Sequence, residues 1–151
     1  MALSSMMILS ATAATGTVMT VAAAEETTAV ADLSLSVTNN MQSTKCGLSL
    51  VVDFNTGAIE LYPHVGFSEG SSSGFTYSVG FVENYNGLGD YGGAFLQSGV
   101  GYYWGINHCF DPYSSYDEAV KATTITFGSG ASWGVGYDWY FDSIVIKKPR
   151  E

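Results

Sequence analysis

The chain is poor in cysteine, proline and basic residues. It has 2 Cys and 3 Pro, and its 5 Lys and Arg residues face 14 Asp and Glu residues, which gives a formal net charge of −9. Such an acidic chain is repelled by the phosphates of DNA or RNA, so we expect no nucleic-acid partner. The two cysteines form no CxxC motif, and we predict neither a metal site nor any other cofactor.

Charge is also absent from residues 1–24, which contain no Asp, Glu, Lys or Arg. This stretch is apolar and rich in small residues, and Ala22 and Ala24 occupy the small-residue positions of an A-x-A-like cleavage site. We therefore predict a signal peptide cleaved after Ala24 and a secreted, extracellular protein. No Lys or Arg lies near Met1, so a start codon upstream of Met1 and an uncleaved membrane anchor stay open as alternatives.

The remaining length leaves room for one domain. Residues 25–31 have the composition of a flexible leader, and the alternating strand patterns lie within residues 32–146. Residues 147–151 carry a small basic cluster and form a predicted solvated tail. We predict a single β-domain over 32–146.

From Thr124 to Asp142 large apolar side chains alternate with small or polar ones. A period of two is typical of a strand with one buried face. Because one strand of this length is unusual, we predict two strands bent at Ser129 and Gly130. The large apolar positions are Ile125, Phe127, Ala131, Trp133, Val135, Tyr137, Trp139 and Phe141.

Shorter alternating segments cover much of the rest of the domain. The clearest is a hairpin in which Gly57 lies in the turn between two apolar faces, and Pro63 in the return strand favours a sheet edge or a bulge. A Ser-x-x-Glu capping box at Ser115 predicts a short helix over 116–122. The other predicted strands are 32–37, 48–54, 58–67, 75–82 and 94–106.

No βαβ pattern is present, so the fold is predicted to be all-β with one antiparallel sheet. Glycines that repeat on one strand face, such as Gly99, Gly101 and Gly105, indicate bends or close approach. We therefore predict a strongly curved sheet that closes as a small β-barrel of about seven or eight strands, with a β-sandwich as the alternative. In a soluble barrel the aromatic face fills the interior, whereas in a membrane barrel it faces lipid. We predict the inward orientation.

Cys46 and Cys109 are the only cysteines, and in an oxidising compartment they are expected to form a disulfide. The features that would indicate catalysis are weak. His64 and His108 have no serine in a nucleophile motif. The carboxylates Glu60, Glu83, Asp90, Asp138 and Asp142 offer only the unspecific pairings that any acidic protein has. We do not favour an enzyme.

Two loops, residues 83–91 and residues 107–116, are better suited to contact than to chemistry, because they combine tyrosines, amides and carboxylates, and the first also has flexible glycines. They give the predicted ligand-binding residues. The alternative is that the tyrosines plug the ends of the barrel. The predicted residues are Tyr85, Asn86, Asp90, Tyr91, His108, Asp111, Tyr113 and Tyr116.

The stretch from Tyr85 to Phe95, followed by alternating glycine and aromatic residues, resembles β-rich segments of bacterial RHS-type polymorphic toxins and related secreted proteins. The similarity extends over residues 58–142 and is one of composition. It implies a bacterial, secreted or competition-related context and designates no catalytic residue.

The sequence thus predicts a secreted β-barrel that binds a protein, a cell-wall glycan or a small apolar ligand. The main alternative is a membrane-active or pore-forming protein, because amphipathic strands rich in Gly, Ser and Thr also suit membrane insertion. A hydrolase is the third and least favoured possibility.

Overall fold

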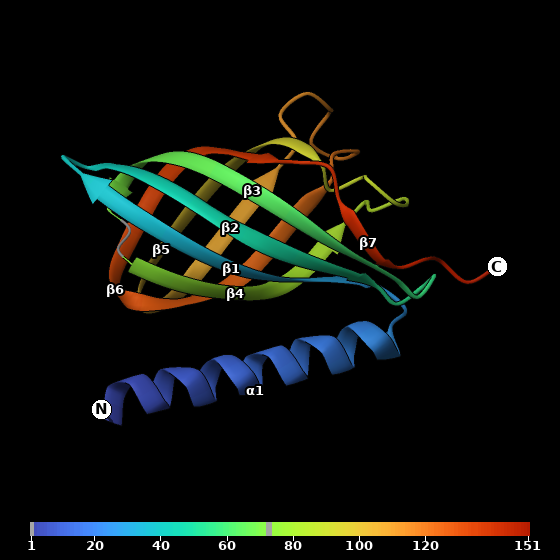
Figure 1. Ribbon diagram of the computed structural model, residues 1–151, viewed down its shortest axis with the longest axis horizontal. Helices are drawn as coiled ribbons and strands as arrows, with labels where there is room; N and C mark the ends of the chain where they lie inside the picture. Colours follow the sequence, from blue (N-terminus) through green and yellow to red (C-terminus); the bar gives the residue numbers. More distant parts are fainter. Residues whose placement is uncertain (1, 72–73) are drawn as a thin grey trace.

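The computed structural model describes residues 2–71 and 74–151, which form one helix followed by seven antiparallel strands (Figure 1). The predicted all-β antiparallel barrel is confirmed. The elements are α1 (Ala2–Ala24), β1 (Thr28–Asn39), β2 (Gln42–Asp53), β3 (Ala58–Ser71), β4 (Gly74–Glu83), β5 (Gly93–Phe110), β6 (Lys121–Tyr140) and β7 (Ile144–Lys147).

The barrel is closed by β6, which pairs with both edges of the sheet β4-β1-β2-β3. Residues 121–128 of β6 pair with β4, and residues 133–140 pair with β3. Strand β5 follows the other edge of β6 along nearly its whole length. The sequence predicts two strands bent at Ser129 and Gly130, whereas the structure has one continuous strand that changes its pairing partner there. The side chains of residues 129–133 are not among those that the structure describes.

Strand β5 bends at Tyr103, which has φ +60° and interrupts the register between Tyr102 and Trp104. Its two arms approach closely at this bend, because a Cβ added to Gly101 would lie 2.5 Å from the Cα of Gly105. Contacts this short exclude any residue with a side chain. The prediction that these glycines mark a bend with close approach is confirmed.

The predicted orientation of the strands is wrong, because the aromatic and aliphatic face points outward. Phe67, Trp104 and Trp139 are 69%, 64% and 53% exposed, whereas His64 and Asp138 on the opposite face are 1% and 2% exposed. The physical reason is space: a barrel of about eight strands has an interior that side chains just fill, and apart from the aromatic rings at one end small and polar side chains fill it here. The glycine, serine and threonine face therefore turns inward.

Four buried aromatic rings meet at one end of the barrel. Tyr91 contacts Tyr62, Phe95 and Tyr140 with centroid distances of 5.7, 5.1 and 4.9 Å. These rings belong to a buried cluster that also includes Val30. Edge-to-face and tilted pairs of this kind each stabilise the fold by about 1 kcal/mol beyond the burial of their surface.

Helix α1 lies along the outside of the barrel, next to β4 and β1 (Figure 1). Val18 and Ala22 are buried against Ala29 and Val79. Within the described residues no helix combines the length and apolar character needed to cross a membrane. Helix α1 lies within the predicted signal peptide, residues 1–24, and cleavage after Ala24 stays a prediction.

Three local features differ from the expectation. Strand β1 begins at Thr28, so the segment expected to be a flexible leader includes buried strand residues. The predicted helix over 116–122 is replaced by a turn, in which the Ser115 carbonyl accepts hydrogen bonds from the amides of Glu118 and Ala119 at 3.0 and 2.8 Å. The basic tail is not free, because the Arg150 amide donates to the carbonyl of Thr56 at 2.7 Å.

Candidate functional site: a polar lumen

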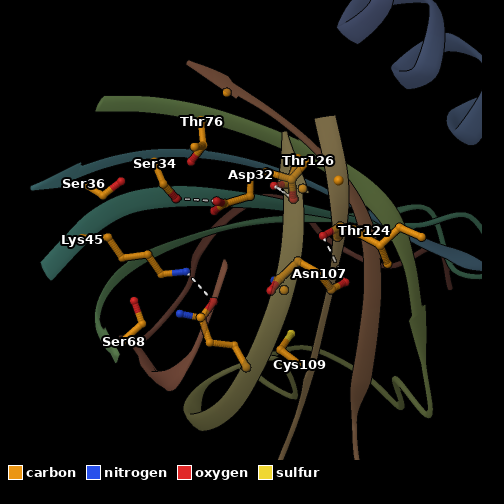
Figure 2. Close-up of a pocket in the computed structure, with 18 of the residues that line it drawn as sticks. Asp32, Ser34, Ser36, Lys45, Ser68, Thr76, Asn107, Cys109, Thr124 and Thr126 are labelled. Carbon is orange, nitrogen blue, oxygen red and sulfur yellow. Dashed lines mark hydrogen bonds between the residues drawn. The ribbon is translucent and has the colours of Figure 1, made fainter. Parts of the chain in front are cut away.

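The interior of the barrel holds a cavity of about 110 Å³ that is lined mainly by polar side chains (Figure 2). It extends from the bend of β5, where the lining residues Trp104 and Ile106 are themselves exposed, to the buried rings of Tyr91 and Tyr140. The polar lining residues include Asp32, Ser34, Ser36, Ser43, Lys45, Ser68, Thr76, Ser78, Gln97, Asn107, Thr124, Thr126 and Asp138.

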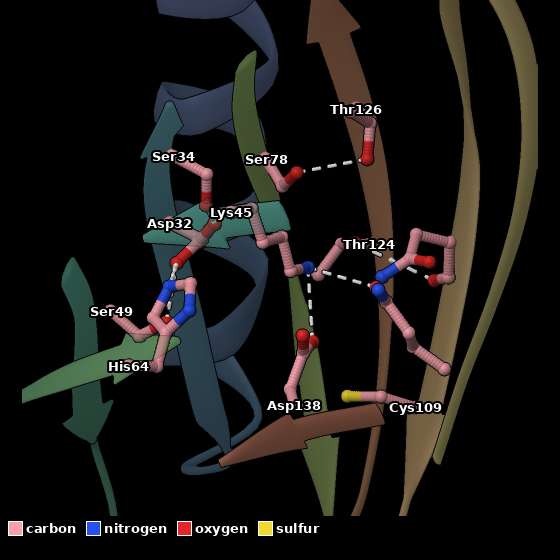
Figure 3. Close-up of polar contacts among 12 residues, drawn as sticks. Asp32, Ser34, Lys45, Ser49, His64, Ser78, Cys109, Thr124, Thr126 and Asp138 are labelled. Atoms are coloured by element: carbon pink, nitrogen blue, oxygen red, sulfur yellow. Dashed lines mark hydrogen bonds and ion pairs between the residues drawn. The ribbon is translucent and has the colours of Figure 1, made fainter. Parts of the chain in front are cut away.

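Asp32 of β1 is the centre of one hydrogen-bonded group in the lumen (Figure 3). Its Oδ1 lies 2.5 Å from Nε2 of His64 and accepts a hydrogen bond from Ser49 Oγ at 2.6 Å, while Oδ2 accepts one from Ser34 Oγ at 2.5 Å. Burial raises the pKa of Asp32, but the hydrogen bond and charge of His64 outweigh it and hold this pKa below the ordinary value. Nδ1 of His64 is buried without a hydrogen-bond partner.

Lys45 of β2 spans the lumen to two partners on the opposite wall. Its Nζ lies 3.0 Å from Oδ2 of Asp138 and donates to Oε1 of Gln97 at 2.9 Å. Burial lowers the pKa of Lys45, but the charges of Asp138 and Asp32 outweigh it, so the pKa is raised. Burial also raises the pKa of Asp138, against the opposing effect of Lys45. Oδ1 of Asp138 has no hydrogen-bond partner.

The lumen contains no arrangement typical of nucleophilic catalysis among the described residues. Both serines beside Asp32 donate to its carboxylate, and neither is hydrogen-bonded to His64. Burial raises the pKa of the Cys109 thiol to about 11, which keeps it protonated at neutral pH. No group of three or more His, Cys, Asp or Glu side chains in the described ranges is placed to hold a metal ion. The lumen presents hydroxyl, amide, carboxylate and ammonium groups, which are able to form hydrogen bonds with small polar groups.

A second polar group lies at the aromatic end, around the buried carboxylate of Glu60. Oε1 accepts hydrogen bonds from the Gly89 amide at 2.9 Å and from Ser143 Oγ at 2.6 Å. Oε2 accepts from the Tyr62 hydroxyl at 2.9 Å and from the Tyr85 hydroxyl. Burial, together with the hydrogen bond to Glu60, raises the pKa of both tyrosines well above its ordinary value. Glu60 thus fastens segment 84–92 to β3.

The predicted ligand-binding residues of the first loop do not form an open surface. Tyr85 bonds to Glu60, and Tyr91 is 2% exposed among the aromatic rings. Asp90 accepts a hydrogen bond from the Asn86 amide at 2.7 Å, which shapes the turn between them. The two tyrosines therefore fill the end of the barrel, as the alternative interpretation of these loops describes.

The predicted residues of the second loop lie on the outside. The Tyr116 hydroxyl is 3.0 Å from Nε2 of His108, and Asp111 accepts a hydrogen bond from the Tyr113 amide at 2.9 Å. The Asn84 amide side chain donates to the carbonyls of Asp117 and Ala119 at 2.9 and 2.8 Å, so it ties the two loops together. The two groups of residues thus share one end of the barrel but no common pocket.

The predicted disulfide is absent, because both cysteines are free. Cys46 is exposed on the outer face of β2, whereas Cys109 is buried and lines the lumen. Alternate residues of a strand point to opposite faces of a sheet, and these two positions fall on opposite sides of the barrel wall.

The sequence reasoning missed Asp32 and Lys45 as interior residues and gave Asp138 no role in a lumen. A signal was present: each is a single charge within an apolar alternating strand, on the face that also carries glycine and serine. Charges at such positions become paired when the face is buried. These charges therefore indicate that the strand face with the glycines and serines is the interior of the barrel.

Comparisons of the chain with protein-family models, with curated proteins and with solved structures find no match. The functional conclusion therefore depends on the apolar outer surface of the barrel and on its polar interior. The resemblance to RHS-type toxins stays a prediction.

Proposed function

We propose that this protein is a membrane-inserted β-barrel whose outer wall contacts lipid acyl chains and whose lumen is polar. The observation that carries the proposal is the orientation of the strands. A membrane barrel alternates apolar side chains outward with polar side chains inward. The exposed apolar residues of the wall, here called the belt, are Leu33, Leu35, Val37, Leu48, Val65, Phe67, Phe75, Val100, Tyr102, Trp104, Ile106, Ile125, Val135, Tyr137 and Trp139.

The distribution of charge supports the same function. Among the described residues, every Asp, Glu, Lys and Arg of β1–β6 either faces the interior or lies within three residues of a strand end. Of the strand-end positions outside the cavity, Glu69 and Glu83 are exposed, whereas Asp53 and Lys121 are 6% and 8% exposed. A charged side chain at the bilayer midplane costs about 2–4 kcal/mol on the lipid face of a barrel. The belt avoids that cost.

The dimensions of the wall fit a bilayer. Strands β1 and β2 have 12 residues and β4 has 10, and a tilted strand needs about 9–11 residues to cross the hydrocarbon core. Exposed aromatic residues lie on both sides of the bend in β5 (Tyr102, Trp104). Others lie at or next to the end of β6 that pairs with the start of β5 (Trp139, Phe141). Membrane barrels carry aromatic girdles at both interfaces.

A soluble binding module is less well supported. Soluble monomers rarely expose contiguous apolar patches of more than a few hundred Å², whereas the belt has exposed apolar residues on each of β1–β6. The lumen suits a small apolar ligand poorly, because the ion pairs of Asp32 and Lys45 and a set of hydroxyl groups lie beside its apolar lining residues. Lipid is the solvent that suits this outer surface.

The test is flotation with liposomes of zwitterionic lipid, chosen because the chain is acidic. We expect the mature chain, refolded in their presence, to float with the vesicles and to resist protease over the strands. Leu48→Lys places a charge in the belt and is expected to reduce the floating fraction. Leu88→Lys, at an exposed leucine in segment 84–92, is the matched control and should float like the wild type. A wild-type chain that stays monomeric in water and does not float contradicts the proposal.

A further inference from the structure

Two polar compartments lie along the axis of the barrel. The first is the cavity around Lys45, Asp138 and Asp32. The second is the group of donors around Glu60 at the aromatic end. If nothing separated these two polar compartments, they would form one hydrated path through the barrel.

The two compartments are separated by a layer of aromatic rings, here called the septum, formed by Tyr62, Tyr91, Phe95 and Tyr140. Tyr91 and Tyr140 line the cavity on one side. On the other side Tyr62 donates its hydroxyl hydrogen bond to Glu60. All four side chains are 6% exposed or less. The septum therefore blocks the path as the fold stands.

Tyr91 is the one septum residue that does not belong to a strand, because it lies in segment 84–92 between β4 and β5. Side chains hold this segment to the rest of the barrel: Glu60 holds the Gly89 amide and the Tyr85 hydroxyl, and Asn84 holds two carbonyls of the neighbouring loop. The Tyr91 hydroxyl also lies 3.7 Å from Sγ of Cys109. The segment's own backbone bonds, from Asp90 to Gly87 and from Gly92 to Gly89, are local turns. The segment is therefore able to move out without breaking a strand pairing.

The lumen favours positive solutes. Among the described interior side chains, the carboxylates of Asp32, Asp138 and Glu60 outnumber two basic groups, the Lys45 ammonium paired with Asp138 and the His64 imidazole paired with Asp32. A cleft of one sign inside a low-dielectric wall attracts counter-ions of the other sign. The narrow interior of a barrel with so few strands limits passage to small ions.

We propose, on the basis of the membrane insertion proposed above, that the barrel conducts small monovalent cations through its lumen and that segment 84–92 is the plug that closes it. Tyr91 is the part of the plug that completes the septum. Glu60 and Asn84 are the positioning residues that hold the plug in place. Outward movement of the segment removes Tyr91 from the septum and joins the two compartments.

The test compares ion flux in vesicles that hold potassium ions and carboxyfluorescein. Tyr91→Ala removes the ring from the septum, and Leu88→Ala, on the exposed side of the same segment, is the matched control. Potassium efflux through Tyr91→Ala is expected to rise about tenfold or more over the wild type, because a plug that lacks its buried ring populates the open state more. Leu88→Ala should match the wild type, and carboxyfluorescein should stay inside for all three.

A second readout guards against a misfolded variant. In a Cys46→Ser background, a water-soluble cationic methanethiosulfonate should label Cys109 faster in Tyr91→Ala than in the parent, while flotation and protease resistance stay equal. Equal efflux and equal labelling in variants that float overturn the conduction proposal, as does a preference for chloride over potassium. A barrel that does not float at all overturns membrane insertion itself, so the two failures are distinguishable.

Discussion

Nε2 of His64 lies 2.5 Å from Oδ1 of Asp32 inside a wall whose outer surface is aliphatic and aromatic. The next residue of each strand points the other way: Leu33 is 43% and Val65 40% exposed. An ion-paired interior behind an apolar exterior is the reverse of a water-soluble protein. It is the arrangement that lipid as a solvent requires.

The Asp32–His64 pair predicts a loss of stability in acid. Because the pKa of Asp32 is held below its ordinary value of 3.8 in the folded barrel, its ionised form stabilises the fold above that value. This contribution is lost as the pH falls from about 3.8 through the lower folded-state pKa. We expect Asp32→Asn to lack that acid-side loss, measured as the free energy of unfolding by urea in detergent micelles.

Asp138→Asn is the control for this experiment. Burial raises the pKa of Asp138, so protonation of this residue favours the folded state as the pH falls. The variant should therefore keep the acid-side loss that Asp32→Asn removes. An unchanged acid profile in Asp32→Asn contradicts the assignment.

The Lys45–Asp138 pair predicts a strong dependence of each partner on the other. Lys45→Met leaves the buried carboxylate of Asp138 without its cation and is expected to destabilise the barrel by about 3–5 kcal/mol. The double variant Lys45→Met with Asp138→Leu should recover most of this loss, because an apolar pair needs no desolvation of charge. A double-mutant cycle measures the coupling, and additive effects of the two substitutions would show that the pair does not interact.

The free cysteines predict a difference in thiol reactivity. Cys46 is exposed, whereas burial raises the pKa of Cys109 to about 11. In detergent-solubilised barrel we expect a maleimide to modify Cys46 rapidly and Cys109 slowly, with the Cys109 rate rising toward alkaline pH because the thiolate is the reactive form. Mass spectrometry of chymotryptic peptides gives the two rates, because the aromatic residues between Cys46 and Cys109 place the cysteines on separate peptides. Thiols that react only after reduction would establish the disulfide instead.

The Glu60 carboxylate predicts the stability of segment 84–92. In Glu60→Gln the amide nitrogen cannot accept the hydrogen bonds that one carboxylate oxygen accepts, which leaves buried donors unsatisfied at a cost of about 1–3 kcal/mol. We expect faster hydrogen exchange at the Gly89 amide, which donates to Glu60. Glu69→Gln, at an exposed carboxylate of the same strand, is the control. Equal exchange at Gly89 in both variants would show that Glu60 does not hold the segment.

The strand alternation was sufficient to predict the barrel but not which face is inside. Ser34 and Ser36 alternate with Leu33 and Leu35, and this pattern assigns two faces without stating which solvent each one meets. In water the apolar face of such a strand is buried, whereas in lipid the apolar face is on the outside, although the period of two is the same. The prediction of an inward aromatic face assumes water outside the barrel, and it therefore places Trp139 in the core.

The candidate site was harder to predict than the fold, because it is built from residues far apart in the chain. The pairs Asp32–His64 and Lys45–Asp138 bring together different strands of a closed barrel, and only the strand register brings them into contact. The disulfide prediction failed for a related reason: strand parity sends Cys46 outward and Cys109 inward. The tyrosines of segment 84–92 were identified from composition, but composition did not reveal the buried carboxylate that holds Tyr85.

The orientation of Trp139 in lipid is the most direct test of a lipid-facing wall. A variant that keeps Trp139 and carries phenylalanine at Trp104 and Trp133 reports on this position alone. Bound to vesicles whose acyl chains are brominated, its fluorescence should be strongly quenched, because the ring is 53% exposed on the belt. Unquenched fluorescence from a folded, vesicle-bound barrel would contradict a lipid-facing belt.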